Sequence, residues 1–421
     1  MLGAGIRAVT TVAESPPARL LDLSRLISRA GRMPTGIDRV ELAYLRAFLA
    51  ESVPLFGLIK TSLGFVLLDG RGCRGLLDRF DGVMRWGPVD RISRFRRALA
   101  IDRQRAEADA RRLSVARCLP LGLRRMLAGR VPQGTSYLNV GHANLSDRVL
   151  EAVGRALQGQ IAVMIHDTIP LDHPHFQRDG TVLRFQKLLR RVQMKADLVL
   201  CNSAQTKADV ARHMALHGPV PQCLVVPLGV EVLTPEPQVI LPVGFDISRP
   251  CFITIGTLEP RKNHLFLLDL WARMEADLPS EKMPQLLICG ARGWKNEAVF
   301  KRLDNDLMMG RHIFELPGLS DGQIAALLAQ VQGALFPSHA EGFGLPPAEV
   351  LAQGIPVICN DLEIYREILG DYPVYVSVQD SYLWRQEIEK LATDQMNGQA
   401  TVAGFIPPSW HDHFNVVLSR V

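Results

Sequence analysis

Short runs of β-branched and apolar residues alternate with longer helical stretches throughout the second half of the chain. Helical spacing appears, for example, in NHLFLLDLWARMEADL and DGQIAALLAQVQ, which separate such runs. This alternation is typical of a parallel sheet covered by helices, and it predicts one doubly wound α/β domain. The expected strands are CFITIGTL (251–258), QLLICGA (285–291), HIFELPG (312–318), GALFPS (333–338) and PVICND (356–361).

A second α/β domain is expected upstream, because further buried-strand patterns precede a proline-rich segment. That segment, 234–250, has no clear period, so we place the interdomain linker there. The predicted domains are residues 1–235 and 236–400. Ligands in open α/β sheets bind at the carboxyl ends of the strands, so we expect the chemistry in a cleft between these domains. The upstream strands are IAVMIHDT (161–168), ADLVLCNS (196–203) and QCLVVPLG (222–229).

Composition narrows the class of protein. A chain of 421 residues exceeds what one hydrophobic core usually serves, and 47% hydrophobic with 22% charged residues excludes a disordered or fibrous protein. The seven cysteines are scattered without a CxxC pair, which predicts buried free thiols rather than disulfides or a zinc site. With no sustained apolar region at the N-terminus and no transmembrane stretch, the expected location is the cytoplasm.

Positive charge is concentrated in residues 91–130. This segment holds twelve arginines against three acidic residues, although the whole chain carries only +5. Such an excess predicts attraction to phospholipid headgroups, a polyprenyl pyrophosphate or nucleic acid. Nucleic acid is the weakest of these, because aromatic residues other than Phe95 are missing from the segment. The alternative is a solvated, arginine-rich helical face.

The stretch EGFGLPPAE combines a glycine-rich loop with the start of a helix. The loop follows the strand GALFPS, and the two prolines stand where proline is favoured, in the first helical turn. The N–H groups of Phe343, Gly344 and Leu345 would then point, with the helix dipole, at one place. We expect a phosphate there.

Two carboxylates flank this turn and have separate roles. Glu341 lies in the loop and Glu349 about one turn inside the helix, so they cannot form a tight pair. Each could accept hydrogen bonds from sugar hydroxyls on either side of a phosphate. Stabilisation of the helix dipole would explain the presence of Glu349, but it does not explain why Glu341, Gly342 and Gly344 occur in the loop.

A second candidate site is GTLEPRKNH, from Gly256 to His264, at the end of the strand that opens the C-terminal domain. Arg261 and Lys262 follow a turn, and Asn263 could cap the next helix. Two cations at a strand end suit a pyrophosphate, whereas cations at a helix start oppose its dipole. The functional interpretation is therefore preferred.

These residues resemble a known family. EGFGLPPAE is similar to the Glu-x7-Glu motif of retaining glycosyltransferases of family 4, and GTLEPRKN is similar to that family's diphosphate-binding segment. The resemblance covers most of the chain and is weakest over 70–130. It extends to the N-terminal half through PTGIDRVELAYLRAFL (34–49), SYLNVGHANL (136–145), MIHDTIPLDHP (164–174) and LVLCNSAQTKAD (198–209).

The resemblance implies a GT-B fold: α/β, with two facing Rossmann-like, doubly wound domains. Residues 401–421 would form a C-terminal helix that packs back on the N-terminal domain. It further implies that Glu349 holds the nucleotide ribose, while Arg261 and Lys262 hold the pyrophosphate. Glu341 and the turn that follows it would hold donor-sugar hydroxyls and phosphate oxygens.

The remaining implied site residues lie elsewhere in the chain. Gly36 would allow close backbone approach to the phosphate or the acceptor, His166 would face the transferred sugar, and Ser203 matches a family serine. The expected catalytic residues are His166, Glu341, Arg261 and Lys262. The expected donor-binding residues are Gly36, Ser203, Gly256, Arg261, Lys262, Glu341, Gly342, Phe343, Gly344, Leu345 and Glu349.

Neither a metal nor a cofactor is expected. The Asp-x-Asp sequence DND at 304–306 lies inside a helical pattern, so it is interpreted as exposed polar surface. His173 and His175 lie two residues apart around a proline, which indicates a loop rather than a metal site. Asp167 is expected either to cap a turn or to orient His166.

The sequence therefore predicts a retaining glycosyltransferase that moves a sugar from a nucleotide-diphosphate donor to a glycan or polyprenyl-pyrophosphate-linked acceptor, in surface polysaccharide or lipopolysaccharide synthesis. Mannose is the preferred sugar, and peripheral contact with an anionic membrane is a further expectation. A nucleotide-sugar epimerase of the same fold and a catalytically silent nucleotide-sugar-binding protein remain the alternatives; a glycogen-type phosphorylase would need a longer chain and a pyridoxal lysine.

Overall fold

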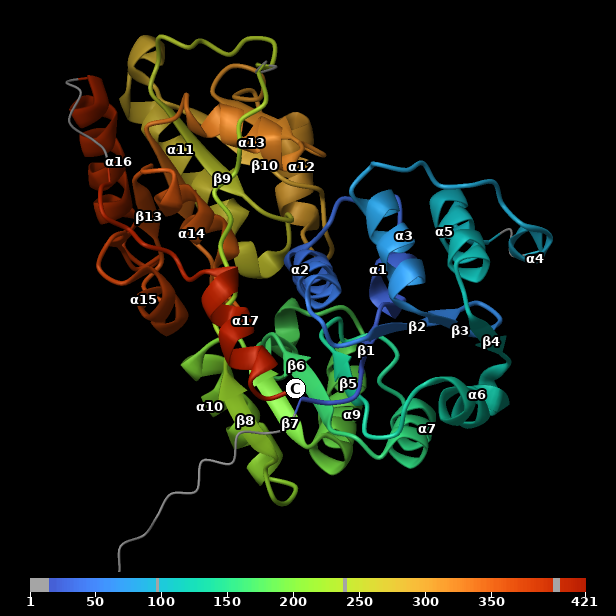
Figure 1. Cartoon of the computed structure of the whole chain (residues 1–421). Helices are drawn as coiled ribbons and strands as arrows, with labels where there is room; N and C mark the ends of the chain where they lie inside the picture. The colour runs from blue at the N-terminus through green and yellow to red at the C-terminus, as the bar shows by residue number, and fades with distance from the viewer. Residues whose placement is uncertain (1–14, 96–97, 238–240, 397–401) are drawn as a thin grey trace, which may run out of the picture. The chain divides into compact units, whose positions relative to one another are not determined.

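The computed structural model describes residues 15–95, 98–237, 241–396 and 402–421, and it contains two sheets (Figure 1). The first has eight strands in the order β4-β3-β2-β1-β5-β6-β7-β8, and the second has six in the order β11-β10-β9-β12-β13-β14. Helices lie in most of the intervals between consecutive strands. The predicted α/β class with two Rossmann-like sheets is confirmed.

The first sheet is parallel at its centre and antiparallel at one side. β1 pairs in parallel with β2 and β5, and β5 pairs in parallel with β6. β3 runs antiparallel to both β2 and β4, so this part of the sheet is a meander. The strands are β1 Arg19–Asp22, β2 Leu55–Thr61, β3 Gly64–Leu68, β4 Ala116–Cys118, β5 Ser136–Asn139, β6 Ile161–Ile165, β7 Leu198–Cys201 and β8 Gln222–Val225.

Local sequence signals set the helices of the first half. The helix α2 begins at Gly36 because Asp38 accepts hydrogen bonds from the Thr35 N–H at 2.7 Å and from its hydroxyl at 2.8 Å. The helices are α1 Ser24–Arg29, α2 Gly36–Ala50, α3 Gly70–Phe80, α4 Arg91–Arg94, α5 Ile101–Arg112, α6 Leu123–Arg130, α7 Asp147–Leu157, α8 Ile169–Asp172, α9 Thr181–Lys195 and α10 Ala204–Ala215.

All five strands expected in the second half are confirmed, although each is shorter than its pattern. The residues beyond each strand leave the sheet as loops; Gly256, for example, has φ +145° directly after β9. The neighbouring strands of this sheet pair in parallel. They are β9 Cys251–Ile255, β10 Gln285–Cys289, β11 Ile313–Leu316, β12 Gly333–Phe336, β13 Val357–Cys359 and β14 Val374–Tyr375.

The core of the second sheet is built around two tryptophans. Trp271 and Trp384 are fully buried, and each indole N–H donates to a carbonyl oxygen, of Pro284 at 3.0 Å and of Val376 at 3.1 Å. Their polar atoms are thereby satisfied inside an apolar cluster. The helices are α11 His264–Asp277, α12 Glu297–Asn305, α13 Asp321–Leu328, α14 Leu345–Ala352, α15 Glu363–Leu369, α16 Ser381–Met396 and α17 Trp410–Leu418.

The chain forms two compact units. The first contains the described residues up to Met164, with Arg191–Leu200 and His411–Val421, and the second contains Ile165–Arg190 and Cys201–Trp410. The domain limits expected near residues 235 and 400 stay a prediction. Part of the expected linker, 238–240, and the start of the expected C-terminal segment, at 401, lie outside the described residues.

The last helix belongs to the first unit. His413 on α17 is buried, and its Nε2 lies 2.9 Å from the hydroxyl of Tyr44 on α2. The Arg19 guanidinium donates to the main-chain oxygen of Val421 at 3.0 and 3.1 Å. The expected packing of a C-terminal helix on N-terminal elements is therefore present in this unit.

The cysteines are all free thiols, five of them buried, as expected from their scattered positions. Among the residues that the structure describes, no helix has the length and apolar character needed to cross a membrane.

Acid should weaken the second unit through His264, the first residue of α11. The side chain is 2% exposed, and burial, with the nearby Lys262 cation, lowers its pKa to about 3. The unfolded imidazole titrates near 6.5, so between these values the unfolded chain binds a proton that the folded chain does not. Stability therefore falls as the pH drops through this window, and His264 alone should cost about 2 kcal/mol between pH 7 and pH 5.

This expectation is checked by urea unfolding at both pH values. The variant His264→Leu should lose about 2 kcal/mol of the difference between pH 7 and pH 5. An unchanged difference would show that the imidazole titrates equally in both states.

Candidate active site

The candidate site is assembled at the carboxyl ends of two adjacent strands, β9 and β12. After β9 the chain passes Gly256 and forms a single 3-10 turn, Pro260–Lys262. After β12 it forms the loop from Ser338 to Gly344 and enters α14. Because β9 and β12 are parallel neighbours, both loops leave the same edge of the sheet.

Glu341 is the centre of this site. Its side chain is 5% exposed, and its carboxylate accepts from Arg261 Nη1 at 2.7 Å and from Lys262 Nζ at 2.6 Å. The Ser338 hydroxyl donates at 2.7 Å, and the Tyr365 hydroxyl lies at 3.3 Å. Burial alone would raise the pKa of Glu341, but the two cations outweigh it and lower this pKa to about 2. Glu341 is therefore ionised.

The two cations are held against carboxylates rather than exposed to solvent. Arg261 also pairs with Glu259 at 2.7 Å and donates to the Ala340 carbonyl at 2.9 Å. Lys262 is buried, which lowers its pKa, while the attraction of Glu341 opposes that shift. Two cations and two carboxylates thus form a compact, almost dehydrated network. Such a network fixes the position of each charged group.

The predicted capping role of Asn263 is wrong. This residue has φ +55° and lies at the start of α11, but its side chain makes no capping hydrogen bond. The amide instead donates to the Pro337 carbonyl at 3.2 Å. Asn263 therefore ties the loop after β9 to the loop after β12.

The turn before α14 has the predicted form. Gly344 has φ +92°, and a Cβ atom there would meet the Tyr365 ring at 2.9 Å, so glycine is required twice over. The N–H groups of Phe343, Gly344 and Leu345 donate to no backbone or side-chain acceptor within the described residues. Glu349 lies one turn inside α14 and is 7% exposed. The turn thus offers donors for an anion.

His166 and Asp167 approach this turn within the second unit. A Cβ atom on Gly342 would lie 3.0 Å from Asp167 and 3.1 Å from the His166 carbonyl oxygen, so little more than glycine fits there. Asp167 accepts from the Ile169 N–H at 3.1 Å, which confirms the turn-capping interpretation. Burial raises the pKa of Asp167, and Arg261 opposes the shift.

Ser203 and Gly36 have local structural roles as well. The Ser203 hydroxyl accepts from the Thr206 N–H at 2.9 Å and caps α10, and the preceding Asn202 amide donates to the His166 carbonyl at 2.8 Å. Gly36 begins α2 in the first unit. Contact of Gly36, Ser203, Gly256 or any other site residue with a donor stays a prediction.

Sequence reasoning missed four residues of the network. Glu259 stands inside the quoted stretch and could have been found as the acid preceding the arginine. Ser338, Asn360 and Tyr365 carried no signal, because only the pairing of β12 with β13 brings the last two to Glu341. Asn360 acts indirectly, since its amide donates to the Ser338 carbonyl at 2.8 Å.

The DND sequence at 304–306, which was interpreted as exposed polar surface, lies at the end of α12. Asp304 lies on α12 and pairs with Arg292 at 2.7 Å. Asp306 ends that helix, but it is only 14% exposed and pairs with Arg302, so the expected exposure of DND holds for Asp304 and Asn305 but not for Asp306. No cluster of three or more His, Cys, Asp or Glu side chains within the described ranges could hold a metal.

Residues 242–401 match the family model described as glycosyl transferases group 1. Two mannosyltransferases of Escherichia coli are also similar in sequence. The serotype-specific mannosyltransferase WbdA is 29% identical over 53% of this chain and 28% of its own length. The O-antigen chain mannosyltransferase B is 25% identical over 57% of this chain and 63% of its own length. This chain thus spans less than two thirds of either relative.

Solved structures show the fold. HepE from Anabaena, in complex with UDP-glucose, has a TM-score of 0.60 at 14% identity, covering 96% of this chain and 97% of its own. The lipopolysaccharide outer core galactosyltransferase WaaB has a TM-score of 0.56 at 15% identity, covering 96% of this chain and 99% of its own. The predicted GT-B fold class is therefore confirmed.

Proposed function

We propose that this chain is a retaining glycosyltransferase that uses a nucleotide-diphosphate sugar. Its GT-B fold and the match of residues 242–401 to the glycosyl transferases group 1 model support this. The acceptor is a glycan or a polyprenyl-pyrophosphate-linked glycan of a bacterial surface polysaccharide. Mannose is the sugar we propose, because both sequence relatives described above are named mannosyltransferases.

The observation that carries this proposal is the network of Glu341, Arg261 and Lys262 beside the turn that begins α14. A departing nucleoside diphosphate gains negative charge as its bond to the sugar breaks. Positively charged groups and N–H donors that are fixed beforehand stabilise this charge without reorganising. Glu341 pairs with both cations, and Gly344 takes the positive φ of a turn whose three successive N–H groups have no acceptor within the described residues.

We assign a role in donor binding to each residue from its place in the candidate site. Arg261 and Lys262 bind the diphosphate; Glu341 holds them and accepts from a sugar hydroxyl. The Phe343, Gly344 and Leu345 N–H groups bind phosphate oxygens, and Glu349 accepts from the ribose. We include Gly36, His166, Ser203, Gly256 and Gly342 in the donor-facing surface. Retention requires no covalent nucleophile in this proposal, and no metal or cofactor takes part.

The proposed location is the cytoplasm, with peripheral contact at the inner face of the plasma membrane. The arginine-rich segment 91–130 supports this contact by its charge, although residues 96 and 97 lie outside the described part of the chain.

A thermal-shift screen against UDP-, GDP- and ADP-sugars tests the proposal. Because the ligand binds only the folded state, a donor at 100 times its dissociation constant should stabilise the protein by about 2.7 kcal/mol. We expect GDP-mannose to raise the melting temperature and the corresponding nucleoside monophosphate to do so much less. A protein that responds to none of the donors would contradict the proposal.

Product analysis separates transfer from the alternatives. With the donor from the screen and an acceptor glycan, proton NMR should show a new linkage whose anomeric configuration equals that of the donor. An inverted linkage would contradict retention, and a changed nucleotide sugar formed without acceptor would indicate an epimerase.

A further inference from the structure

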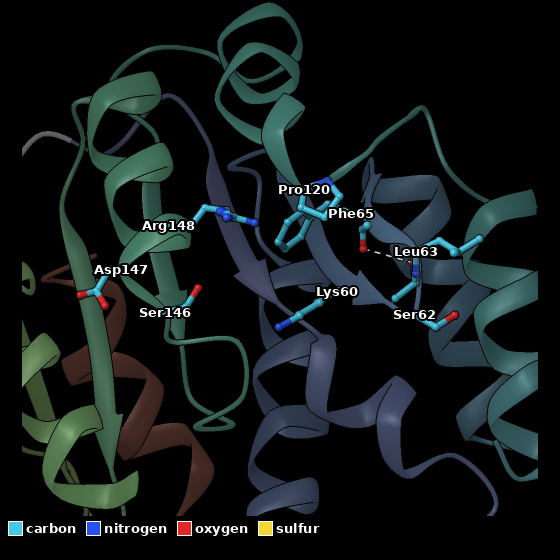
Figure 2. A pocket seen from close by; sticks show the side chains of 10 residues that line it. Lys60, Ser62, Leu63, Phe65, Pro120, Ser146, Asp147 and Arg148 are labelled. Atoms are coloured by element: carbon cyan, nitrogen blue, oxygen red, sulfur yellow. Dashed lines mark hydrogen bonds between the residues drawn. The ribbon is translucent and has the colours of Figure 1, made fainter. Parts of the chain in front are cut away.

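The first unit contains a cavity of about 640 Å³ that shares no residue with the network described above (Figure 2). Strand directions place its lining at the carboxyl edge of the first sheet. β2 ends at Thr61 and β4 ends at Cys118, while the antiparallel β3 begins there, at Gly64. The lining residues are Lys60, Thr61, Ser62, Leu63, Gly64, Phe65, Pro120, Ser146, Asp147 and Arg148.

Two cations of this cavity lack counterions. Figure 2 shows the side chains of Lys60, from β2, and Arg148, from α7, reaching into the space between these elements. Neither side chain forms an ion pair or hydrogen bond with a residue in the described part of the chain. The Asp147 carboxylate is turned to Arg191, at 2.9 Å. The cavity therefore has a positive excess.

The other acid near the cavity is also engaged. Glu107 on α5 is fully buried and accepts from the Ser62 N–H at 3.1 Å and hydroxyl at 2.7 Å, while pairing with Arg103 at 3.2 Å. These hydrogen bonds hold the β2–β3 turn against α5. The charge that faces the cavity thus comes from Lys60 and Arg148, which favours an anionic guest.

Leu63 lines the cavity, and further exposed apolar residues adjoin the lining residue Pro120 in the sequence. Leu63 is 40% exposed, and the neighbours of Pro120 in the chain, Leu119 and Leu121, are 72% and 89% exposed. A second cavity, of about 420 Å³, shares Leu63 and is lined by Arg91, Ile92 and Phe95. Phe95 is 87% exposed. Apolar side chains next to cations without counterions are the combination that binds lipid at a membrane surface.

We propose that the cavity between Lys60 and Arg148 binds the phosphate headgroup of a lipid, whose chains lie against Leu63, Leu119 and Leu121. This inference rests on the proposed function, because the polyprenyl-pyrophosphate acceptor proposed above is one lipid of this kind. The other source of the same chemistry is an anionic phospholipid of the membrane. Either would bring the first unit to the bilayer surface.

Vesicle sedimentation tests the proposal with the full chain. Three vesicle types are compared: phosphatidylcholine alone, phosphatidylcholine with phosphatidylglycerol, and phosphatidylcholine with a few per cent of polyprenyl pyrophosphate. We expect binding to one or both of the vesicle types that contain an anionic lipid, and not to phosphatidylcholine alone. The double variant Lys60→Gln/Arg148→Gln should bind about 30-fold more weakly, as expected for two basic groups at a membrane surface. Leu121→Ser should also weaken binding.

The matched control is Arg155→Gln. Arg155 lies seven residues after Arg148 on the same helix, is 66% exposed and does not line the cavity. It should bind vesicles within about twofold of the unchanged protein. Equal losses in the control and the double variant would overturn the proposal. So would equal binding to all three vesicle types, or vesicle binding that a soluble acidic glycan abolishes.

Failure of this proposal is distinguishable from failure of the proposed function. The same variants are melted with the donor from the thermal-shift screen and assayed on a lipid-free acceptor. A retained donor shift with lost vesicle binding supports the lipid site, whereas vesicle binding without any donor shift would leave the lipid site standing and contradict nucleotide-sugar transfer.

Discussion

Replacing Glu341 with alanine is expected to lower the free energy of unfolding by about 3–5 kcal/mol. The carboxylate is the partner that Arg261 and Lys262 share, and its side chain is 5% exposed. Without it Lys262 keeps a buried charge with no counterion, while Arg261 retains Glu259. Urea unfolding of the two proteins at pH 7 measures the difference.

The reason for this loss can be tested with pH and with a control. Since burial lowers the pKa of Lys262, the amine of the variant can lose its proton, so the deficit should be smaller at pH 9 than at pH 7. Glu275→Ala, at an exposed position on α11, should change stability by less than about 0.5 kcal/mol. A deficit below about 1 kcal/mol for the Glu341 variant would contradict the electrostatic account.

Replacing Lys262 with methionine should lower the catalytic rate and leave the stability almost unchanged. We expect kcat of the proposed transfer to fall about 10²–10³-fold, because one fixed cation beside the departing diphosphate is lost. Stability should change little, because Glu341 keeps Arg261 and Ser338 as partners and a buried amine is exchanged for an apolar side chain. Initial rates with saturating donor and acceptor measure the effect.

The control for this variant is Lys301→Met, the same exchange at an exposed position on α12. It should leave kcat within about twofold of the unchanged protein. A Lys262 variant that transfers sugar at the normal rate would remove the cation pair from the proposed mechanism. A variant that fails only because it unfolds would be recognised from its urea curve.

The alternation of strands and helices predicted five of the six strands of the second sheet, because β10, β12 and β13, for example, are short runs that are buried on both faces. β14, with two partly exposed residues, was missed. In the first sheet the five strands that come first in the chain, β1 to β5, were missed. β4 has only three residues, none of them fully buried, so its place depends on pairing with β3 rather than on its own sequence. Local periodicity cannot reveal such a strand.

The candidate site was predicted in its parts but not in its connections. The sequence indicated that Arg261, Lys262 and Glu341 act near a phosphate, yet it gave no sign that the acid binds both cations across about 80 residues of chain. That arrangement depends on β9 and β12 being neighbours in the sheet. The capping role expected of Asn263 failed for the same reason, because its partner, Pro337, lies on the second loop.

Because α17 packs beside α2, the first unit includes residues that are synthesised long after most of that unit. The Tyr44 hydroxyl makes its hydrogen bond with His413, which follows 369 positions later in the chain. During synthesis the first unit must stay incomplete until residues 411–421 have left the ribosome. Shortening the chain by its final helix would therefore damage the portion made first.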